Sequence, residues 1–202
     1  GFLAGQHLLD SGIDVVPYDL GIITSSACLA HDIGNPPFGH AGEDAIREWS
    51  KDNLDTVMDS WELQDILNFE GNAQGFRILT RLEAWQRYGG LRTTLSTLGA
   101  FIKYPCSSVD MGNSTDSVSQ KKFGFFKDDS ASFREIFEGL GIAKKHNSEN
   151  AYPRYPLAFL TEAADDICYA VVDLEDAYHL GIIPFSETRD LLMSIAGKDF
   201  GF

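Results

Sequence analysis

Apolar residues recur at helical spacing along most of this 202-residue chain. The pattern predicts helices over residues 2–10, 19–33, 42–50, 72–86, 133–140 and 157–180. Gly12 follows the first of these, and Gly34, Pro36 and Pro37 follow the second, where glycine and proline commonly end a helix. No internal repeat or low-complexity tract is present. We therefore expect an all-α fold.

Residues 104–132 depart from this helical pattern. The stretch is rich in small polar residues and turn formers, namely Pro105, Ser107, Ser108, Gly112, Asn113, Ser114 and Ser117. It is too long for a simple turn, and long loops of this kind are often functional. The composition predicts a flexible insertion or a lid.

The longest predicted helix, residues 157–180, has an acidic face. At about 100° per residue, one arc contains Glu162, Asp165, Asp166, Tyr169, Asp173 and Asp176, and the opposite side contains Leu160, Ala163, Ile167, Val171 and Leu174. Periodicity alone favours a solvated face. However, Tyr169 is costly in a purely solvated stripe, and Asp165, Tyr169 and Asp173 form one column that can line a pocket. Both interpretations stay open.

Residues 28–43 carry the densest candidate chemistry. His31 and Asp32 offer an imidazole nitrogen and a carboxylate oxygen, a ligand pair that suits Mn, Fe, Ni or Mg better than thiolate-loving metals. His40 and Glu43 are three residues apart, so they share a face if a helix has begun there. A His-Asp dipeptide also occurs by chance in many chains. The glycines and prolines around it indicate a rigid loop, which favours a functional site.

Composition indicates an ordinary soluble globular domain. The chain is 44% hydrophobic and 23% charged, and it is long enough to bury a sizeable core. No apolar run reaches the ~20 residues of a membrane helix, and no signal peptide opens the chain. Cys28, Cys106 and Cys168 lack the spacing of a zinc site or a disulfide framework. We expect a reducing cytoplasm and no membrane partner.

The formal net charge of −14 argues against a general nucleic-acid binder. Affinity for a phosphate backbone comes from clustered Lys and Arg, and such clusters are not favoured by this composition. A free nucleotide is not excluded, because its site needs only a few local cations and a metal.

The segment His-Asp-Ile-Gly-Asn-Pro-Pro-Phe-Gly-His-Ala-Gly-Glu, residues 31–43, resembles the signature of the deoxyguanosine triphosphate triphosphohydrolase (dGTPase-like) family of the HD-domain superfamily. Further blocks resemble that family in its order, over roughly residues 1–185, at residues 68–77, 103–105, 121–125 and 162–169. The resemblance implies an HD-domain helical bundle. Residues 1–202 would then be part of a single HD-type phosphohydrolase domain, a fragment of a larger helical enzyme.

The resemblance also implies a metal centre and its chemistry. His31, Asp32 and Asp165 would bind a divalent ion, with Mg or Mn favoured and Fe, Co or Ni as alternatives. His40 and Glu43 would act on the attacking water. The implied reaction is hydrolysis of dGTP, or of several deoxynucleoside triphosphates, to a 2′-deoxynucleoside and inorganic triphosphate, in an enzyme expected to form homo-oligomers.

Substrate contacts follow from the same resemblance. Tyr169 and Asp173 would hold the deoxyribose 3′-hydroxyl, and a ring below the sugar would leave no space for a 2′-hydroxyl. A site built for a hydroxyl rejects analogues that lack it. The remaining implied substrate-binding residues are Asn72, Lys103, Tyr104 and one of Lys121 or Lys122. On sequence alone, a surface position is the favoured interpretation for each lysine.

One departure from the family pattern leaves alternatives. The HD superfamily has a metal site of the form H…HD…D, and this sequence is expected to begin after the first His. His7 lies earlier but lacks the family's flanking Ser and Glu, so we interpret it as structural. With three protein ligands the affinity for metal should be weaker. The alternative functions are those of another HD nucleotide phosphohydrolase and of a nucleotide-sensing subunit with a decayed metal site.

Overall fold

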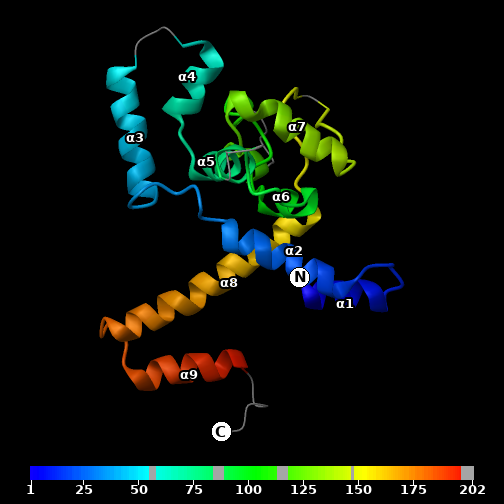
Figure 1. The fold of residues 1–202 in the computed structure, drawn as a ribbon. Helices are drawn as coiled ribbons and strands as arrows, with labels where there is room; N and C mark the ends of the chain where they lie inside the picture. Colours follow the sequence, from blue (N-terminus) through cyan, green and yellow to red (C-terminus); the bar gives the residue numbers. More distant parts are fainter. Residues whose placement is uncertain (55–57, 84–88, 113–117, 147, 197–202) are drawn as a thin grey trace. The chain divides into compact units, whose positions relative to one another are not determined.

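The computed structural model describes most of the chain, namely residues 1–54, 58–83, 89–112, 118–146 and 148–196. Throughout these ranges the backbone forms helices and loops. The β-type pairing found in them is limited to an isolated bridge between Cys106 and Ala151. The predicted all-α fold is therefore confirmed (Figure 1). The chain divides into two compact units, Gly1–Glu162 and Ala163–Phe202, and each is described by itself.

The first two helices, α1 (Phe2–Asp10) and α2 (Pro17–Ala30), pack against each other. Pro17 takes the first position of α2, where its missing N–H costs nothing. A Cβ on Gly5 would lie 2.6 Å from Cα of Pro17, so only glycine permits this close approach. His7 is exposed on α1 and is not packed in a core.

Helix α2 ends at Ala30, before the predicted end at residue 33. The chain continues in turns, with the N–H of Ile33 donating to the carbonyl of Ala30 over 3.0 Å. Bonds of this i to i+3 type tighten the end of a helix. His31 and Asp32 consequently lie on the turn after the helix and not within it.

Helix α3 (His40–Asn53) contains the predicted helix 42–50 and starts two residues earlier. A short helix that was not predicted, α4 (Ser60–Leu67), follows it. Asp59 caps α4 by accepting the backbone N–H groups of Trp61 and Glu62 over 2.9 and 3.0 Å. The two helices are in contact.

Helix α5 (Gly71–Arg77) runs on into one π-helical turn, η1 (Ile78–Leu82). Together they cover most of the predicted helix 72–86, whose last residues lie outside the described part. Helix α6 (Leu95–Phe101), which was not predicted, and α7 (Ser130–Gly139), which was predicted as 133–140, complete the helices around the main core.

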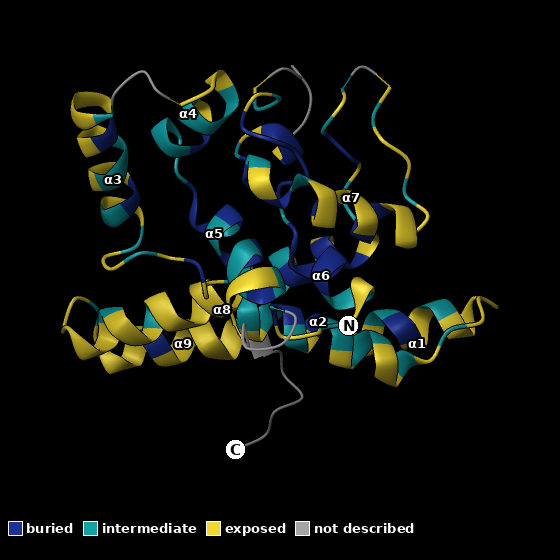
Figure 2. Cartoon of the chain, turned by 45° about the horizontal axis from the view of Figure 1, so that its top comes forward, coloured by how far each residue is buried: buried dark blue, intermediate teal, exposed yellow. Residues whose placement is uncertain are grey.

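Stacked aromatic rings make up much of the core of the first unit. The ring of Phe133 lies 4.0 Å from that of Phe125 and 4.9 Å from that of Phe137. Tyr152 stacks on Phe137 at 4.5 Å. Such rings each bury a large apolar area and dominate core energetics. Figure 2 shows that buried residues gather on α5, α6 and the segments next to them.

The predicted insertion at residues 104–132 contributes to this core. Phe123, Phe125 and Phe126 are buried, and two short 3₁₀ turns, η2 (Val118–Gln120) and η3 (Lys127–Asp129), lie within the segment. Residues 113–117 lie outside the described part. A lid function for this segment stays a prediction.

The longest helix, α8 (Pro156–His179), confirms the predicted helix 157–180. It begins in the first unit, and the second unit contains its remainder and α9 (Phe185–Ala196). Gly181, with φ of +70°, makes the turn between them, and the rings of Tyr178 and Phe185 lie 6.0 Å apart. Among the described helices, none is both long and apolar enough to span a membrane.

Candidate active site

The turn after α2 places the two donors of the predicted His-Asp pair together. Nδ1 of His31 lies 2.6 Å from the carbonyl oxygen of Cys28, which fits a ring that donates its Nδ1–H to that carbonyl. Nε2 then points to Asp32, whose Oδ2 lies 3.3 Å away. In a metal-binding histidine, the ring nitrogen that does not bind the metal commonly donates such a hydrogen bond, and this fixes the tautomer.

These two atoms fit the predicted metal. Donors 3.3 Å apart can both lie at the ~2.0–2.2 Å typical of nitrogen and oxygen ligands around one ion. Asp165, the third predicted ligand, belongs to the second unit. Across the residues that are described, no three or more His, Cys, Asp or Glu side chains are arranged so that they could hold a metal ion. The complete ligand set stays a prediction.

Glycines bring this turn against the start of α5. A Cβ on Gly34 would collide with the backbone of Gly71 and Gly75. A Cβ on Gly71 would in turn lie 2.5 Å from Oδ1 of Asn35 and 3.1 Å from Oε1 of Glu43. The His-Asp turn and the first residues of α5 are therefore in direct backbone contact, and side chains would separate them.

His40 and Glu43 form a hydrogen-bonded pair on α3. Phe38 and Gly39 have φ of 68° and 55°, and this left-handed backbone turns the chain into the helix at His40. Nδ1 of His40 lies 2.8 Å from Oε2 of Glu43. The predicted common face is thus confirmed. The His40 side chain is 83% exposed, whereas that of Glu43 is only 2% exposed.

The buried Glu43 carboxylate is held in its ionised form. Burial by itself would raise its pKa. The N–H of Gly71, which donates to Oε1 over 2.7 Å, and His40 oppose this. The charges of Lys122 and Arg47 act in the same direction, and the pKa of Glu43 lies below its ordinary value. At neutral pH the carboxylate therefore accepts Nδ1–H of His40 and leaves Nε2 for proton transfer.

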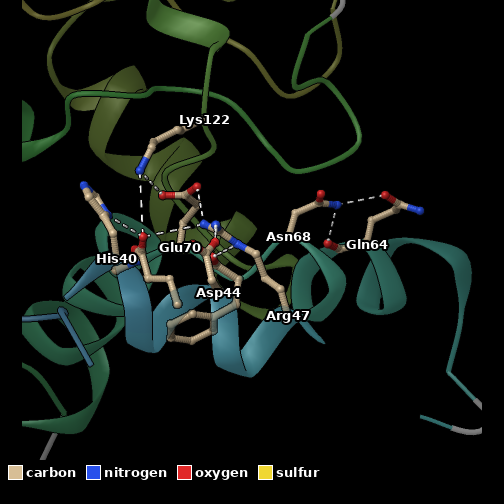
Figure 3. A network of polar contacts seen from close by, with 10 residues as sticks. His40, Asp44, Arg47, Gln64, Asn68, Glu70 and Lys122 are labelled. Atoms are coloured by element: carbon tan, nitrogen blue, oxygen red, sulfur yellow. Dashed lines mark hydrogen bonds and ion pairs between the residues drawn. The ribbon is translucent and has the colours of Figure 1, made fainter. Parts of the chain in front are cut away.

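A second buried carboxylate, Glu70, lies beside this pair (Figure 3). Oε1 of Glu70 is 2.8 Å from Nη2 of Arg47, and Oε2 is 3.0 Å from Nζ of Lys122. Arg47 also donates from Nε to the carbonyl of Phe69 over 2.9 Å. Burial raises the pKa of Glu70, and Lys122 opposes the rise.

Lys121 and Lys122 were predicted as alternatives for one contact with the triphosphate, and their surroundings in the structure differ. Lys121 is exposed, whereas Nζ of Lys122 lies 3.9 Å from Oε2 of Glu43. Asn72 is the second residue of α5 and follows Gly71, which binds Glu43. Lys122 therefore forms an ion pair with Glu43.

Lys103 and Tyr104 follow α6 and form a cluster with Arg154 and Glu162. Nζ of Lys103 lies 3.3 Å from Oε1 of Glu162, and Nη1 of Arg154 lies 2.6 Å from Oε2 of the same carboxylate. Arg154 also donates to the carbonyl of Lys103 over 2.7 Å, and its guanidinium lies 5.8 Å from the centre of the Tyr104 ring. Glu162 thus pairs with both cations, one at each carboxylate oxygen.

The second unit contains the predicted column Asp165, Tyr169 and Asp173 on α8. Tyr169 is 55% exposed and Ile167, on the predicted apolar side, is 66% exposed. Both faces of this part of the helix are therefore open in the described chain. Burial gives no preference between a solvated stripe and a pocket wall.

The chain matches curated proteins over nearly its whole length. It is 47% identical over 190 residues to a deoxyguanosinetriphosphate triphosphohydrolase-like protein of Synechocystis sp., and 46% identical over 190 residues to one of Pseudomonas aeruginosa. A deoxyguanosinetriphosphate triphosphohydrolase of Enterobacter sp. is 33% identical over 216 residues. The matches cover 90%, 91% and 92% of this chain. This chain belongs to the deoxyguanosinetriphosphate triphosphohydrolase-like family.

The family resemblance seen in the sequence is confirmed. The chain spans 43%, 41% and 40% of the length of these three triphosphohydrolase relatives. No family model matches the chain.

Sequence reasoning missed two residues of the site in this triphosphohydrolase-like chain. Arg47 and Glu70 bind one another and surround Glu43, although neither was a candidate. Arg47 follows Glu43 by four residues on a predicted helix, a spacing that places it on the same face. Glu70 lies within the family-like block 68–77, and this was its one signal.

Proposed function

We propose that the full-length protein is a metal-dependent hydrolase of deoxynucleoside triphosphates that releases a 2′-deoxynucleoside and inorganic triphosphate. The observation that carries the proposal is the pairing of an exposed His40 with a buried, ionised Glu43, 2.8 Å apart. The names of the relatives support the substrate class. Enzyme histidines oriented by a carboxylate commonly act as acids or bases near neutral pH.

In the proposed reaction, a water oxygen forms a bond to the α-phosphorus and the bond from that phosphorus to O5′ of the sugar breaks. The electron pair leaves with O5′, which takes up a proton. His40 transfers a proton at Nε2, either from the water or to O5′. Glu43 fixes the tautomer and stabilises the imidazolium that forms, because its carboxylate accepts Nδ1–H.

His31 and Asp32, with Asp165, would hold the divalent ion. When bound, such an ion neutralises charge on phosphate oxygens and makes a nearby water more acidic. The hydrogen bond between Nδ1 of His31 and the carbonyl of Cys28 supports this role, because it orients Nε2. The ion would be Mg or Mn.

Lys122 and Lys103 would bind the triphosphate. Each is presently paired with a buried or half-buried carboxylate, Glu70 at 3.0 Å and Glu162 at 3.3 Å. A triphosphate would compete for these ammonium groups as point charges. Tyr104 would support Lys103, and Asn72 and Lys121 are further contacts in the proposal. Tyr169 and Asp173 would hold the deoxyribose.

Product analysis tests this proposal. The full-length protein is incubated with each of the four deoxynucleoside triphosphates and Mg or Mn, and the products are separated by anion-exchange chromatography. We expect inorganic triphosphate and deoxynucleoside in equal amounts. The matched control is His40→Ala, which should lower kcat by about 10²-fold or more.

Other products would contradict the proposal. Pyrophosphate with a nucleoside monophosphate, or inorganic phosphate with a diphosphate, would mean cleavage at another bond. Binding without turnover would favour a sensing subunit. Turnover of His40→Ala within about threefold of the wild type, less than 1 kcal/mol in the barrier, would reassign His40 to packing of the loop.

A further inference from the structure

Glu70 holds two cations next to the proposed catalytic pair. Its side chain is only 6% exposed, and its two carboxylate oxygens bind different partners. Oε1 binds Nη2 of Arg47 at 2.8 Å and Oε2 binds Nζ of Lys122 at 3.0 Å. A buried carboxylate requires such partners, since an unpaired charge in the interior is costly.

Both cations also face Glu43, but from farther away. Nη2 of Arg47 lies 3.6 Å and Nζ of Lys122 lies 3.9 Å from Oε2 of Glu43. Each of the two cations therefore lies closer to Glu70 than to Glu43, by almost one ångström. Oε2 of Glu43 is also the atom that lies 2.8 Å from His40, so the cations and the imidazole compete for one oxygen.

We infer that Glu70 is a positioning residue that holds Arg47 and Lys122 off Glu43, so that the Glu43 carboxylate stays bonded to His40. The inference rests on the proposed function only for its consequence in catalysis. The arrangement itself is given by the distances above. Figure 3 shows the Glu70 carboxylate next to both Lys122 and Arg47.

The charges that face Glu43 determine whether the pKa of His40 rises or falls when Glu70 loses its charge. Glu43 is faced by His40 and Arg47 from its own helix and by Lys122 and Glu70 from other segments; Arg47 also binds the exposed Asp44 at 2.9 Å. If Glu70 loses its charge, the two cations are left to pair with Glu43. The extra positive charge and the weakened Glu43 bond both disfavour protonated His40. The pKa of His40 should therefore fall.

The test is Glu70→Gln in the full-length protein, which keeps the size of the side chain and removes its charge. The control is Glu62→Gln, which removes a glutamate charge that pairs with Lys127 at 3.2 Å, away from His40. The pKa of His40 is measured by NMR of ¹⁵N-histidine protein without substrate. Its signal is assigned by its loss in His40→Gln. The pH profile of kcat is measured in parallel.

We expect the pKa of His40 to fall by about half a unit or more in Glu70→Gln, within the range of shifts that neighbouring charges cause. The inflection of the kcat profile should move to lower pH, and kcat should fall about tenfold. Glu62→Gln should change neither. An unchanged pKa in Glu70→Gln, or an equal shift in Glu62→Gln, would overturn the inference.

Two further outcomes can be distinguished from a failure of the inference on Glu70. If the wild type does not hydrolyse deoxynucleoside triphosphates, the proposed function fails, but the NMR titration still decides the role of Glu70. If Glu70→Gln does not fold, Glu70→Asp replaces it, since its shorter carboxylate reaches only one of the two cations. It should shift the pKa of His40 in the same direction by a smaller amount, and no shift would overturn the inference.

Discussion

The replacement Glu43→Gln isolates the charge of the buried carboxylate in the site. Glutamine has nearly the same shape, and its carbonyl can still accept the N–H of Gly71, which lies 2.7 Å from Oε1. Its amide group, however, would occupy the position of Oε2. A donor would then face Nδ1–H of His40, and Arg47 and Lys122 would lose the anion that lies 3.6 and 3.9 Å away.

The size of the effect follows from these contacts. A hydrogen bond to a charged group contributes about 1.5–3 kcal/mol. Breaking a buried ion pair by removing one partner costs about 3–5 kcal/mol. Because Glu70 still pairs with both cations, we expect the lower part of that range, a loss of about 3–4 kcal/mol in the free energy of unfolding at pH 7. The kcat should fall about 10²-fold or more, because His40 loses the group that orients it.

The effect of Glu43→Gln should depend on pH in a defined direction. A carboxyl whose pKa is lowered by folding stabilises the protein above its unfolded pKa, and this contribution is lost as the pH falls through the folded value. The ordinary pKa is 4.5 and that of Glu43 lies below it. The difference from the wild type should therefore be constant near neutral pH and shrink below about pH 4.

Urea unfolding at several pH values measures this difference, with Asp44→Asn as the matched control. Asp44 precedes Arg47 on the same helix and binds it at 2.9 Å, but its side chain is 67% exposed. Its loss should cost less than about 1 kcal/mol. If Glu43→Gln is as stable and as active as Asp44→Asn, the buried carboxylate does not have the role assigned to it here.

Three further predictions concern the metal, the backbone and the sugar. Asp32→Ala and Asp165→Ala should each abolish bound divalent metal in elemental analysis of the full-length protein; metal retained by both would refute the ligand assignment. Gly34→Ala should lower stability by about 1–3 kcal/mol, because its Cβ would meet the backbone of α5, whereas Gly21→Ala in α2 should be near neutral; equal melting temperatures would contradict this. Tyr169→Ala should raise the kcat/KM ratio of GTP to dGTP by about 10- to 200-fold, and an unchanged ratio would mean that the sugar is read elsewhere.

Long periodic segments made much of the fold predictable. The first and last of the predicted helices, 2–10 and 157–180, agree with α1 and α8 within one residue at each end. The short helices α4 and α6 were missed, because helices of seven or eight residues depend on packing more than on their own sequence. The 12-residue helix α9 was missed as well. Asp59, which caps α4, was the local signal that could have identified that helix.

The candidate site was predictable where its contacts are local. His40 and Glu43 are three residues apart, so helical geometry alone brings them together. Glu70 lies 23 residues beyond Arg47, and no local rule predicts that contact. The close approach of Gly34 to α5 is equally a product of tertiary packing. Residues that act through long-range contacts could therefore be identified only from the structure.

Hydrolysis in H₂¹⁸O tests the central claim most directly. The full-length protein is given a deoxynucleoside triphosphate and Mg or Mn in labelled water, and both products are analysed by mass spectrometry. Attack of water at the α-phosphorus with loss of O5′ predicts one ¹⁸O in the inorganic triphosphate and none in the deoxynucleoside. Label in the deoxynucleoside, or release of pyrophosphate in place of triphosphate, would contradict the reaction proposed for His40 and Glu43.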